Sequence, residues 1–394
     1  MQIILLVFWI FFGIILYSYV GYAIILYLLV FFKRIFFKSN DFVNDFKPDV
    51  TLFVVAYNEK DFIENKVNNS FSLDYPKDKM HYLWVTDGST DESQEILKKF
   101  PQIQVLFEAE RKGKISAMNR GMKFVKTPIV IFSDANTILS AKSVSSIVDA
   151  FRDNKVGCVA GEKRIINKQI DSAAGAGEGI YWRYESLLKK WDSELYTSVG
   201  AAGELFAIRT DLFKDVEGDT ILDDFMMSMR MAIDGYIIKY VPTAYAIENS
   251  SANVKEELKR KVRIAAGVIQ SIFRLKQAFN PFHNFKLTFQ FFSHKVLRWL
   301  FVPVALPVVY LLNLFLAESF GFFNNNLYSI LFWAHTFLYL LVIIGWFLRS
   351  NNTRFKILFV PYYIFIMNYA MWLGFVRFLK GSQTVNWERA KRAT

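Results

Sequence analysis

Charged residues are absent or sparse in the first part of the chain and in three later apolar runs, and this pattern predicts membrane segments at both ends. Residues 1–32 carry no charged side chain. About 20 helical residues span the hydrocarbon core of a bilayer, so this stretch is long enough to cross once. It lacks the basic start and cleavage site of a signal peptide, and Lys33 and Arg34 place its end in the cytoplasm. We expect an N-terminal transmembrane helix over residues 1–32, with a long buried helix as the alternative.

The carboxyl-terminal third repeats this pattern, which predicts transmembrane or interfacial helices over residues 297–380. The apolar runs are Trp299–Ala317, Leu327–Leu348 and Phe355–Leu379. Pro361 and Arg377 interrupt the last run. Just before these runs, residues 281–296 mix phenylalanines with histidines and lysines, which is typical of an amphipathic helix lying in the membrane interface.

The basic tail, residues 381–394, conflicts with a simple count of crossings. Four crossings from an outside amino terminus would leave the tail outside, whereas its lysines and arginines favour the cytoplasm. Either the segment around Pro361 is re-entrant or interfacial, or the first run does not cross. We expect a multi-pass protein of the cell membrane, with both the tail and the domain between the membrane segments in the cytoplasm.

Between these segments, residues 40–280 alternate short apolar runs with amphipathic stretches, which predicts an α/β domain. Residues 50–56 form a continuous apolar run rich in valine, typical of a strand covered on both faces. The expected strands are residues 50–56, 81–86, 103–107 and 128–132, with helices ending near residues 71, 100 and 125. Such βαβα repetition indicates a Rossmann-like, mostly parallel sheet with helices on both faces.

Polar clusters follow three of these strands, at the strand ends where parallel sheets bind ligands. They are Tyr57-Asn58-Glu59, Asp87-Gly88 and Asp134-Ala135-Asn136. Taken singly, Asp-Gly is typical of a turn, and an aspartate before a helix is typical of a cap. Three clusters at the same edge of one sheet favour a binding site.

The composition narrows the class of ligand. The chain is 53% hydrophobic and 21% charged, so part of it suits a bilayer and part suits water. A net charge of +11 fits nucleic acid, anionic lipid or an anionic substrate, but no nucleic-acid-binding signature is present. Cys158 is the only cysteine, which excludes an internal disulfide and a thiolate zinc cluster. The lipid bilayer and a phosphate-bearing substrate remain as partners, and no nucleic-acid partner is expected.

An ordered set of motifs runs through residues 50–267. They are Val55-Ala56-Tyr57-Asn58-Glu59, Asp74-Tyr75-Pro76, Asp87-Gly88-Ser89-Thr90-Asp91, Lys112-Gly113-Lys114, Asp134-Ala135-Asn136, Gly203-Glu204-Leu205-Phe206-Ala207 and Leu222-Asp223-Asp224-Phe225. Together with the flanking membrane segments, this set resembles the membrane-embedded family 2 glycosyltransferases, which have the GT-A fold. That group includes the synthases of cellulose, hyaluronan and poly-N-acetylglucosamine.

The resemblance implies a binding site for a nucleotide-sugar donor. The residues that it places around the base, ribose and phosphates are Ala56, Tyr57, Glu59, Asp87, Lys114, Asp134, Arg260 and Arg263. It also implies that Asp134 and Asn136 bind Mg2+ or Mn2+, hard cations that favour oxygen ligands. Gly203 and Glu204 would face the acceptor.

Catalysis would fall to Asp224, which the resemblance makes the general base. It would take a proton from the acceptor hydroxyl as that oxygen attacks the anomeric carbon, and one such displacement inverts the configuration. Asp223 could raise the basicity of Asp224 by like-charge repulsion. From the residues alone, without the resemblance, two acids at this place favour a helix amino terminus.

Two positions depart from the family pattern. The usual Asp-x-Asp is Asp-Ala-Asn here, so Asn136 loses one charge and we expect weaker metal binding. In the Gln-x-x-Arg-Trp stretch of the processive synthases, Arg263 matches the arginine, whereas Arg260 replaces the glutamine and Ile264 replaces the tryptophan. The cluster can still grip a diphosphate through forked donors. A basic helix on anionic lipid is the alternative for this cluster.

The sequence thus predicts an inverting, membrane-bound hexosyltransferase that uses a nucleotide-diphosphate sugar, expected to be a UDP-sugar, and builds a growing polysaccharide or glycan. The alternative is a transferase of single sugars onto a polyprenyl-phosphate or lipid-linked acceptor. A catalytically silent membrane subunit is a third hypothesis, but Asp224 and Arg263 argue against it. A small-molecule transporter is a fourth hypothesis, but the small number of membrane crossings argues against it. Few crossings also fit a homo-oligomer.

Overall fold

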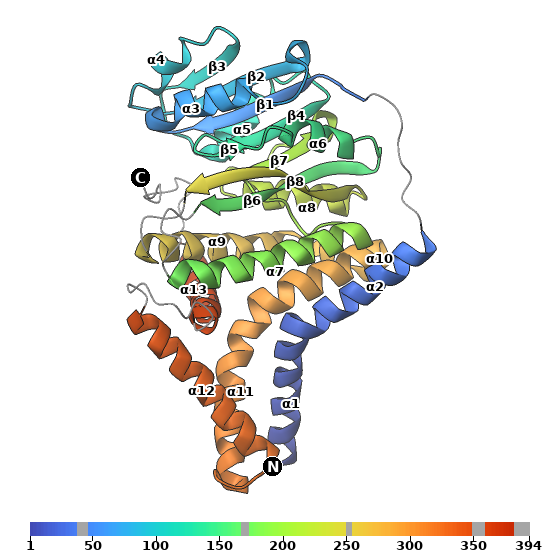
Figure 1. Ribbon diagram of the computed structural model, residues 1–394, viewed down its shortest axis with the longest axis vertical. Coiled ribbons are helices and arrows are strands. Elements are labelled where there is room, and N and C mark those ends of the chain that lie inside the picture. The colour runs from blue at the N-terminus through green and yellow to red at the C-terminus, as the bar shows by residue number, and fades with distance from the viewer. Residues whose placement is uncertain (38–45, 167–172, 250–253, 349–358, 382–394) are drawn as a thin grey trace.

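The computed structural model of the chain describes residues 1–37, 46–166, 173–249, 254–348 and 359–381. A sheet domain stands above a layer of two long helices, α7 (Ala173–Leu195) and α9 (Val254–Arg274), and apolar helices extend below (Figure 1). Apart from Gly381, the predicted basic tail lies outside the described residues.

One eight-stranded sheet forms the domain, in the order β3-β2-β1-β4-β7-β6-β8-β5. The strands are β1 (Val50–Ala56), β2 (Met80–Asp87), β3 (Ile103–Glu108), β4 (Ile129–Asp134), β5 (Ile138–Leu139), β6 (Val156–Ile166), β7 (Leu205–Arg209) and β8 (Ile237–Asn249). Strands β3, β2, β1 and β4 run parallel, and so do β6 and β8, whereas β7 is antiparallel to both of its neighbours. The predicted α/β class with a mostly parallel sheet is confirmed.

Helices cover both faces of the sheet because its central strands are apolar on both sides. Along β1, Phe53 packs into one core, while Leu52 and Val54 pack into the other. The helices are α3 (Lys60–Phe71), α4 (Ser93–Leu97), α5 (Lys114–Met122), α6 (Ser143–Ala150) and α8 (Asp223–Ile233). Helices α5 and α8 share the core of Phe53, and α3, α4 and α6 share that of Leu52.

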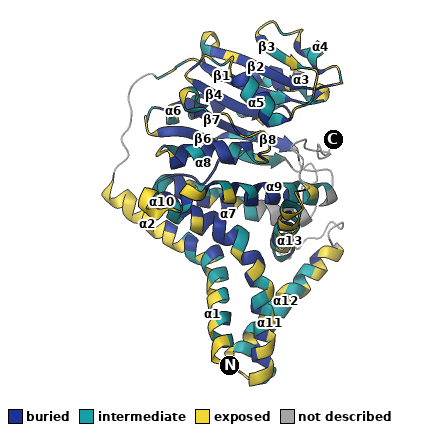
Figure 2. Cartoon of the chain, turned by 180° about the vertical axis from the view of Figure 1, so that it is seen from behind, coloured by how far each residue is buried: buried dark blue, intermediate teal, exposed yellow. Residues whose placement is uncertain are grey.

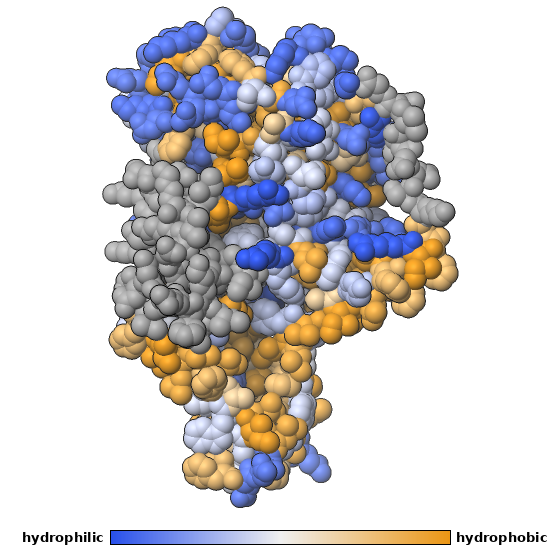
Figure 3. Space-filling model, in the orientation of Figure 1, coloured by the Kyte–Doolittle hydropathy of each residue, from blue (hydrophilic) through white to orange (hydrophobic). Residues whose placement is uncertain are grey.

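The described residues contain four helical runs that are long and apolar enough to cross a membrane. These runs are Gln2–Phe36, Pro281–Phe320, Leu327–Phe347 and Val360–Leu379. Many of their large apolar side chains are exposed (Figure 2), and hydrophobic side chains gather over the lower helices (Figure 3). These surfaces suit contact with lipid.

Two of these runs contain a π-helical segment. The first joins α1 (Gln2–Leu16) to α2 (Tyr22–Phe36) through η1 (Tyr17–Gly21). The second joins α10 (Pro281–Gln290) to α11 (Val302–Phe320) through η5 (Phe291–Phe301). The expected boundary at residue 296, between an interfacial helix and a transmembrane helix, therefore falls inside one continuous helical run.

The last two helices, α12 (Leu327–Leu348) and α13 (Phe359–Leu379), complete the described part of the lower region. Pro361 lies in the first turn of α13, where proline is tolerated, and Arg377 lies in its last turn. Neither residue interrupts the helix. Helix α13 packs against α9 and α7 (Figure 1).

The contact between α13 and α9 depends on a close approach at Gly374. A Cβ atom at this position would lie 2.4 Å from the Cβ of Ala265 and 2.8 Å from the backbone N of Ala266. On the other side, Tyr22 and Leu26 of α2 pack against Leu188 of α7. Helices α7 and α9 are therefore held between the sheet domain and the apolar helices.

Candidate active site

A cavity of about 370 Å³ lies where the sheet domain meets the apolar helices. Its lining comes from the end of β4, the amino end of α5, the segment before β7, the start of α8, and helices α9, η5 and α13. Its charged lining residues are Glu59, Lys114, Asp134, Lys163, Glu185, Lys189, Glu204, Asp223, Asp224, Glu248, Arg260, Lys261, Arg263, Lys295 and Arg298.

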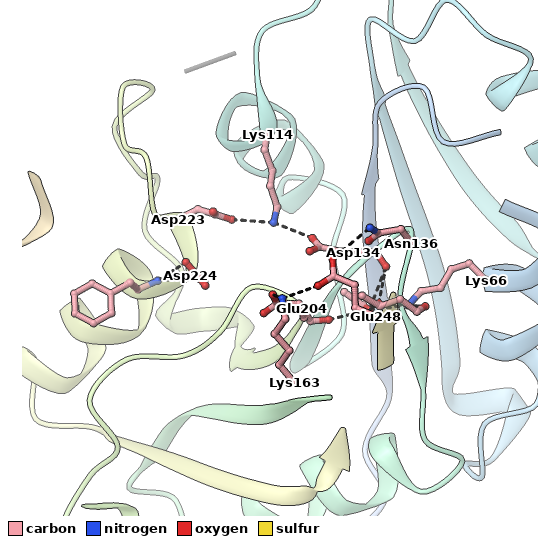
Figure 4. Close-up of polar contacts among 12 residues, drawn as sticks. Lys66, Lys114, Asp134, Asn136, Lys163, Glu204, Asp223, Asp224 and Glu248 are labelled. Atoms are coloured by element: carbon pink, nitrogen blue, oxygen red, sulfur yellow. Dashed lines mark hydrogen bonds and ion pairs between the residues drawn. The ribbon is translucent and has the colours of Figure 1, made fainter. Parts of the chain in front are cut away.

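Lys114 joins two acidic residues that are far apart in the sequence (Figure 4). Its Nζ lies 3.0 Å from Oδ1 of Asp134, at the end of β4, and 3.6 Å from Oδ2 of Asp223, at the start of α8. The three carboxyls of Asp134, Asp223 and Asp224 raise the pKa of Lys114, which opposes the effect of burial. The lysine is therefore a fixed cation at this end of the cavity.

Asp224 lies beside this group, in the first turn of α8. Its Oδ2 would lie 3.2 Å from a Cβ at Gly203, and Lys114 Nζ would lie 3.6 Å from the same point, so the backbone of Gly203 passes close to both charged groups. Burial, and then the charge of Asp223, raise the pKa of Asp224 to about 7. A carboxyl that titrates near neutral pH is suited to accept a proton.

Both acids lie in the first turn of α8, where the helix-terminus alternative also expects them, but neither residue caps the helix. The residue preceding α8 is Leu222, and no side chain caps the helix amino terminus. Asp224 Oδ1 accepts a hydrogen bond only from the adjacent backbone N–H of Phe225, at 2.8 Å, among the described contacts. The acids gain from the helix dipole, but Asp224 remains largely desolvated in the cavity wall.

A second charged group lies behind Asp134. Lys163, on β6, donates hydrogen bonds to Glu204, before β7, and to Glu248, on β8. Asn136 donates from Nδ2 to Oε1 of Glu248 at 3.4 Å (Figure 4). The positive charge of Lys163 stabilises the carboxylate of Glu204 and lowers the pKa of that carboxyl to about 2, against the opposing effect of burial. Glu204 is thus an ionised member of an ion pair with Lys163 in the cavity wall.

The sequence analysis did not identify Lys163 and Glu248, which line the cavity, or Lys66, which lies outside the lining and contacts the turn after β4. Lys66 is fully buried and donates to Ser133 Oγ at 2.7 Å and to the carbonyl oxygen of Thr137 at 2.9 Å. It supports the turn that carries Asp134, and burial lowers its pKa to about 7. A signal was present, because Lys66 lies on the stripe of α3 that Ile63 and Val67 occupy.

Of the residues predicted to surround the base and ribose of the donor, Glu59 lines the cavity, whereas Ala56, Tyr57 and Asp87 do not belong to its lining. Ala56 is buried in β1. The ring of Tyr57 lies 3.8 Å below the guanidinium of Arg111, and Glu59 lines the cavity. Asp87 accepts hydrogen bonds from the backbone N–H groups of the loop before α5, at 2.7 Å from Gly113. Asp87 thus stabilises the loop that precedes Lys114 and positions this lysine.

The two predicted arginines both line the cavity from α9 but differ in their contacts. Arg260 forms hydrogen bonds to both carboxylate oxygens of Glu257, at 3.0 and 2.7 Å. Arg263 has no hydrogen-bond or ion-pair partner within the described part of the chain, and Asp223 and Asp224 are among its electrostatic neighbours. Burial lowers its pKa. Arg263 is therefore the arginine more available to a ligand anion.

The predicted metal ligands fit a weakly held hard cation. Within the described residues, no group of three or more His, Cys, Asp or Glu side chains could hold a metal ion. Asp134 and Asn136 supply a carboxylate and an amide group at the cavity, but Lys114 already takes Oδ1 of Asp134. A divalent ion here would need most of its oxygen ligands from substrate phosphates and water.

Comparison with known proteins finds similarity to a protein family and to a solved structure. The model of Glycosyl transferase family 2 matches residues 51–217. Poly-beta-1,6-N-acetyl-D-glucosamine synthase of Staphylococcus aureus (strain MSSA476) is 30% identical over 230 residues, which are 55% of this chain and 54% of that protein. The Staphylococcus epidermidis synthase is 28% identical over 229 residues, with the same shares. The chain thus spans about half the length of the curated relatives it matches.

A solved structure extends the likeness to nearly the whole chain. It is a mannosyltransferase from Pyrobaculum calidifontis, in complex with GDP-Man and Mn2+, and superposes with a TM-score of 0.71 at 20% identity. The match covers 96% of this chain and 100% of that one. At this identity the likeness concerns the fold, including the arrangement of the apolar helices.

Proposed function

We propose that the protein transfers a hexose from a nucleotide-diphosphate sugar to a glycan or lipid-linked acceptor. The match of the Glycosyl transferase family 2 model to residues 51–217 and the fold shared with a solved mannosyltransferase support this proposal. One observation carries the proposal. Lys114 lies between Asp134 and Asp223, and Asp224, whose pKa is raised to about 7, lies beside them in the same cavity. A fixed cation for a leaving diphosphate and a neutral-range base are what this reaction requires.

Different residues of the cavity have different roles in the proposed transfer. Arg263 and Lys114 hold the diphosphate, whose negative charge grows as the bond to the sugar breaks. Asp224 accepts the proton of the acceptor hydroxyl while that oxygen attacks the anomeric carbon. With a single displacement and a single base, the product has the inverted anomeric configuration. Asp223 keeps the pKa of Asp224 high, and Gly203 leaves space beside it.

Asp134 and Asn136 would hold Mg2+ or Mn2+ together with the donor. When bound, the ion would neutralise the diphosphate as a Lewis acid. The Pyrobaculum mannosyltransferase, which was solved with GDP-Man and Mn2+, supports the use of a divalent ion. Lys114 alone already provides a positive charge at Asp134.

The four apolar helices support a location in a membrane. We place the protein in the cell membrane as a multi-pass protein with the transferase domain in the cytoplasm, where nucleotide-sugars occur. The name of the staphylococcal relatives, a poly-beta-1,6-N-acetyl-D-glucosamine synthase, supports a polysaccharide product. The missing tryptophan of the processive stretch, replaced by Ile264, supports the transfer of single sugars instead.

The proposal is tested by a donor screen. The full chain, purified in detergent or nanodiscs, is incubated with UDP- and GDP-sugars and with Mg2+ or Mn2+, and nucleotide release is measured. We expect release with one donor class, dependence on the divalent ion, and loss of release in Asp134→Asn. No release with any donor, in the presence of a membrane extract that supplies acceptors, would refute the proposed activity.

A further inference from the structure

The cavity has a second charged end, on the side of the apolar helices. It is formed by η5, α7, η1 and α13, and its lining includes Tyr19, Tyr181, Glu185, Lys295, Arg298 and Asn368. None of these residues belongs to the acidic group around Lys114. The strongest electrostatic neighbours of Arg298 are Glu185 and three tyrosines, whereas those of Arg263 are Arg260 and the aspartates of the first end.

Arg298 and Lys295 are buried cations within an apolar helix. They lie on η5, inside the run Pro281–Phe320, which is long and apolar enough to cross a membrane. Their side chains are only 4% and 5% exposed. Ionisable groups in such segments are costly and are usually retained for a function, and π-helical segments are often found at functional sites.

The acids at this end do not balance the cations. Glu185, on α7, accepts hydrogen bonds from both Lys295 and Arg298. The nearby carboxylate of Asp192 forms hydrogen bonds with the ring of His294 and with the hydroxyl of Tyr22. One carboxylate therefore serves two cations, and a third, Lys189, also lines the cavity.

Arg298 has unused donors. Its Nε and Nη1 are buried and have no hydrogen-bond partner within the described residues, while Nη2 is bonded to Glu185. Leaving buried guanidinium N–H groups without acceptors is costly. Arg298 lines the cavity, and an oxyanion bound beside it would supply the acceptors that these two groups lack.

We propose that the membrane-side end of the cavity binds the phosphate of a lipid-linked acceptor, held by Arg298 and Lys295. This inference rests on the proposed transferase function and specifies its acceptor. A lipid tail suits the site because its walls come from apolar helices, with Ile364, Met367 and Met371 of α13 in the lining. The sugar-accepting end of the molecule would then extend toward Asp224, which lines the same cavity.

The test measures equilibrium binding of a polyprenyl phosphate to the full chain in nanodiscs of neutral lipid, without donor. Uncharged polyprenol is the first comparison, and inorganic phosphate is added as a competitor. Two variants, Arg298→Gln and Glu185→Gln, separate ligand binding from a structural ion pair. Lys214→Gln, at an exposed lysine paired with Asp234, is the matched control.

We expect the phosphate to bind more tightly than polyprenol, and Arg298→Gln to weaken it about 10- to 100-fold, as for a lost charge-assisted hydrogen bond. Glu185→Gln should bind at least as tightly as the wild type, because it frees both cations, and Lys214→Gln should not differ from it. A parallel loss in Arg298→Gln and Glu185→Gln would overturn the proposal in favour of a structural pair.

Two further outcomes would also count against it. Equal binding of polyprenol and polyprenyl phosphate would remove the phosphate site. Displacement of the lipid by an equal concentration of inorganic phosphate would assign the site to a free anion instead of a lipid. Because binding is measured without donor, it can succeed where the donor screen fails, so failure of the acceptor site and failure of the transferase activity are distinguishable.

Discussion

Replacing Asp224 with asparagine should remove activity and stabilise the protein at the same time. Burial and Asp223 raise the pKa of Asp224 from 3.8 to about 7. The folded protein therefore keeps a proton that the unfolded chain releases, and this carboxyl makes stability fall as pH rises from about 4 to 7. At about 1.36 kcal/mol per pKa unit, ionisation of Asp224 costs the folded state at most about 4 kcal/mol above pH 7.

The assay compares Asp224→Asn with wild type at pH 5 and pH 8.5. At pH 8.5 the variant should have a higher thermal midpoint, by up to about 10 °C for a domain of this size. At pH 5 the difference should shrink, since the wild-type carboxyl is then protonated. Glycosyl transfer should fall about 10²- to 10⁴-fold, the usual contribution of a general base. Wild-type turnover should rise with pH through about 7.

Asp211→Asn is the control, because Asp211 is exposed and lies outside the cavity. It should change neither the thermal midpoint by more than about 1 °C nor the turnover. The reasoning fails if Asp224→Asn lowers the midpoint at pH 8.5, since the carboxylate would then be stabilising. It also fails if turnover survives the substitution.

Three further predictions test other parts of the site. Lys114→Gln should abolish nucleotide release, because the donor diphosphate loses a cation that binds it. The substitution should also destabilise the protein by up to about 3 kcal/mol in denaturant unfolding, because Asp134 and Asp223 lose their cation. Unchanged donor affinity in the variant would contradict the proposed role of Lys114. Asn136→Asp should lower the half-saturating Mn2+ concentration about tenfold in a titration of activity after EDTA treatment, since it adds a charged ligand; a higher value would show that Glu248 dominates through repulsion. Gly374→Leu should raise the donor KM by displacing α9, whereas Gly13→Leu, which has open space, should not; equal effects would refute the role of this contact.

The first half of the sheet was predictable because local pattern determines it. The apolar run of β1 and its neighbours indicated parallel strands, and parallel strands end at one edge, so Asp134 could be placed at a ligand site. The ends of α4 and α5 were misjudged. Both helices stop before Phe100 and Phe124, whose N–H groups close tighter turns to Leu97 and Gly121.

The second half of the site depends on contacts that local pattern does not contain. Lys163 and Glu248 meet because β6 pairs with β8 across a long stretch of sequence, so neither residue stands out alone. The charged end at Arg298 was missed for a related reason. Residues 281–296 resembled an interfacial helix, in which lysines and histidines face water, whereas η5 turns Lys295 toward Glu185 of α7.

The anomeric configuration of the product tests the central claim most directly. The full chain is supplied with an α-linked nucleotide-sugar and acceptor, and the new linkage is determined by NMR. A single displacement assisted by Asp224 predicts a β-linked product throughout. An α-linked product would contradict it, because a single displacement from the face opposite the leaving group cannot retain the configuration of the anomeric carbon.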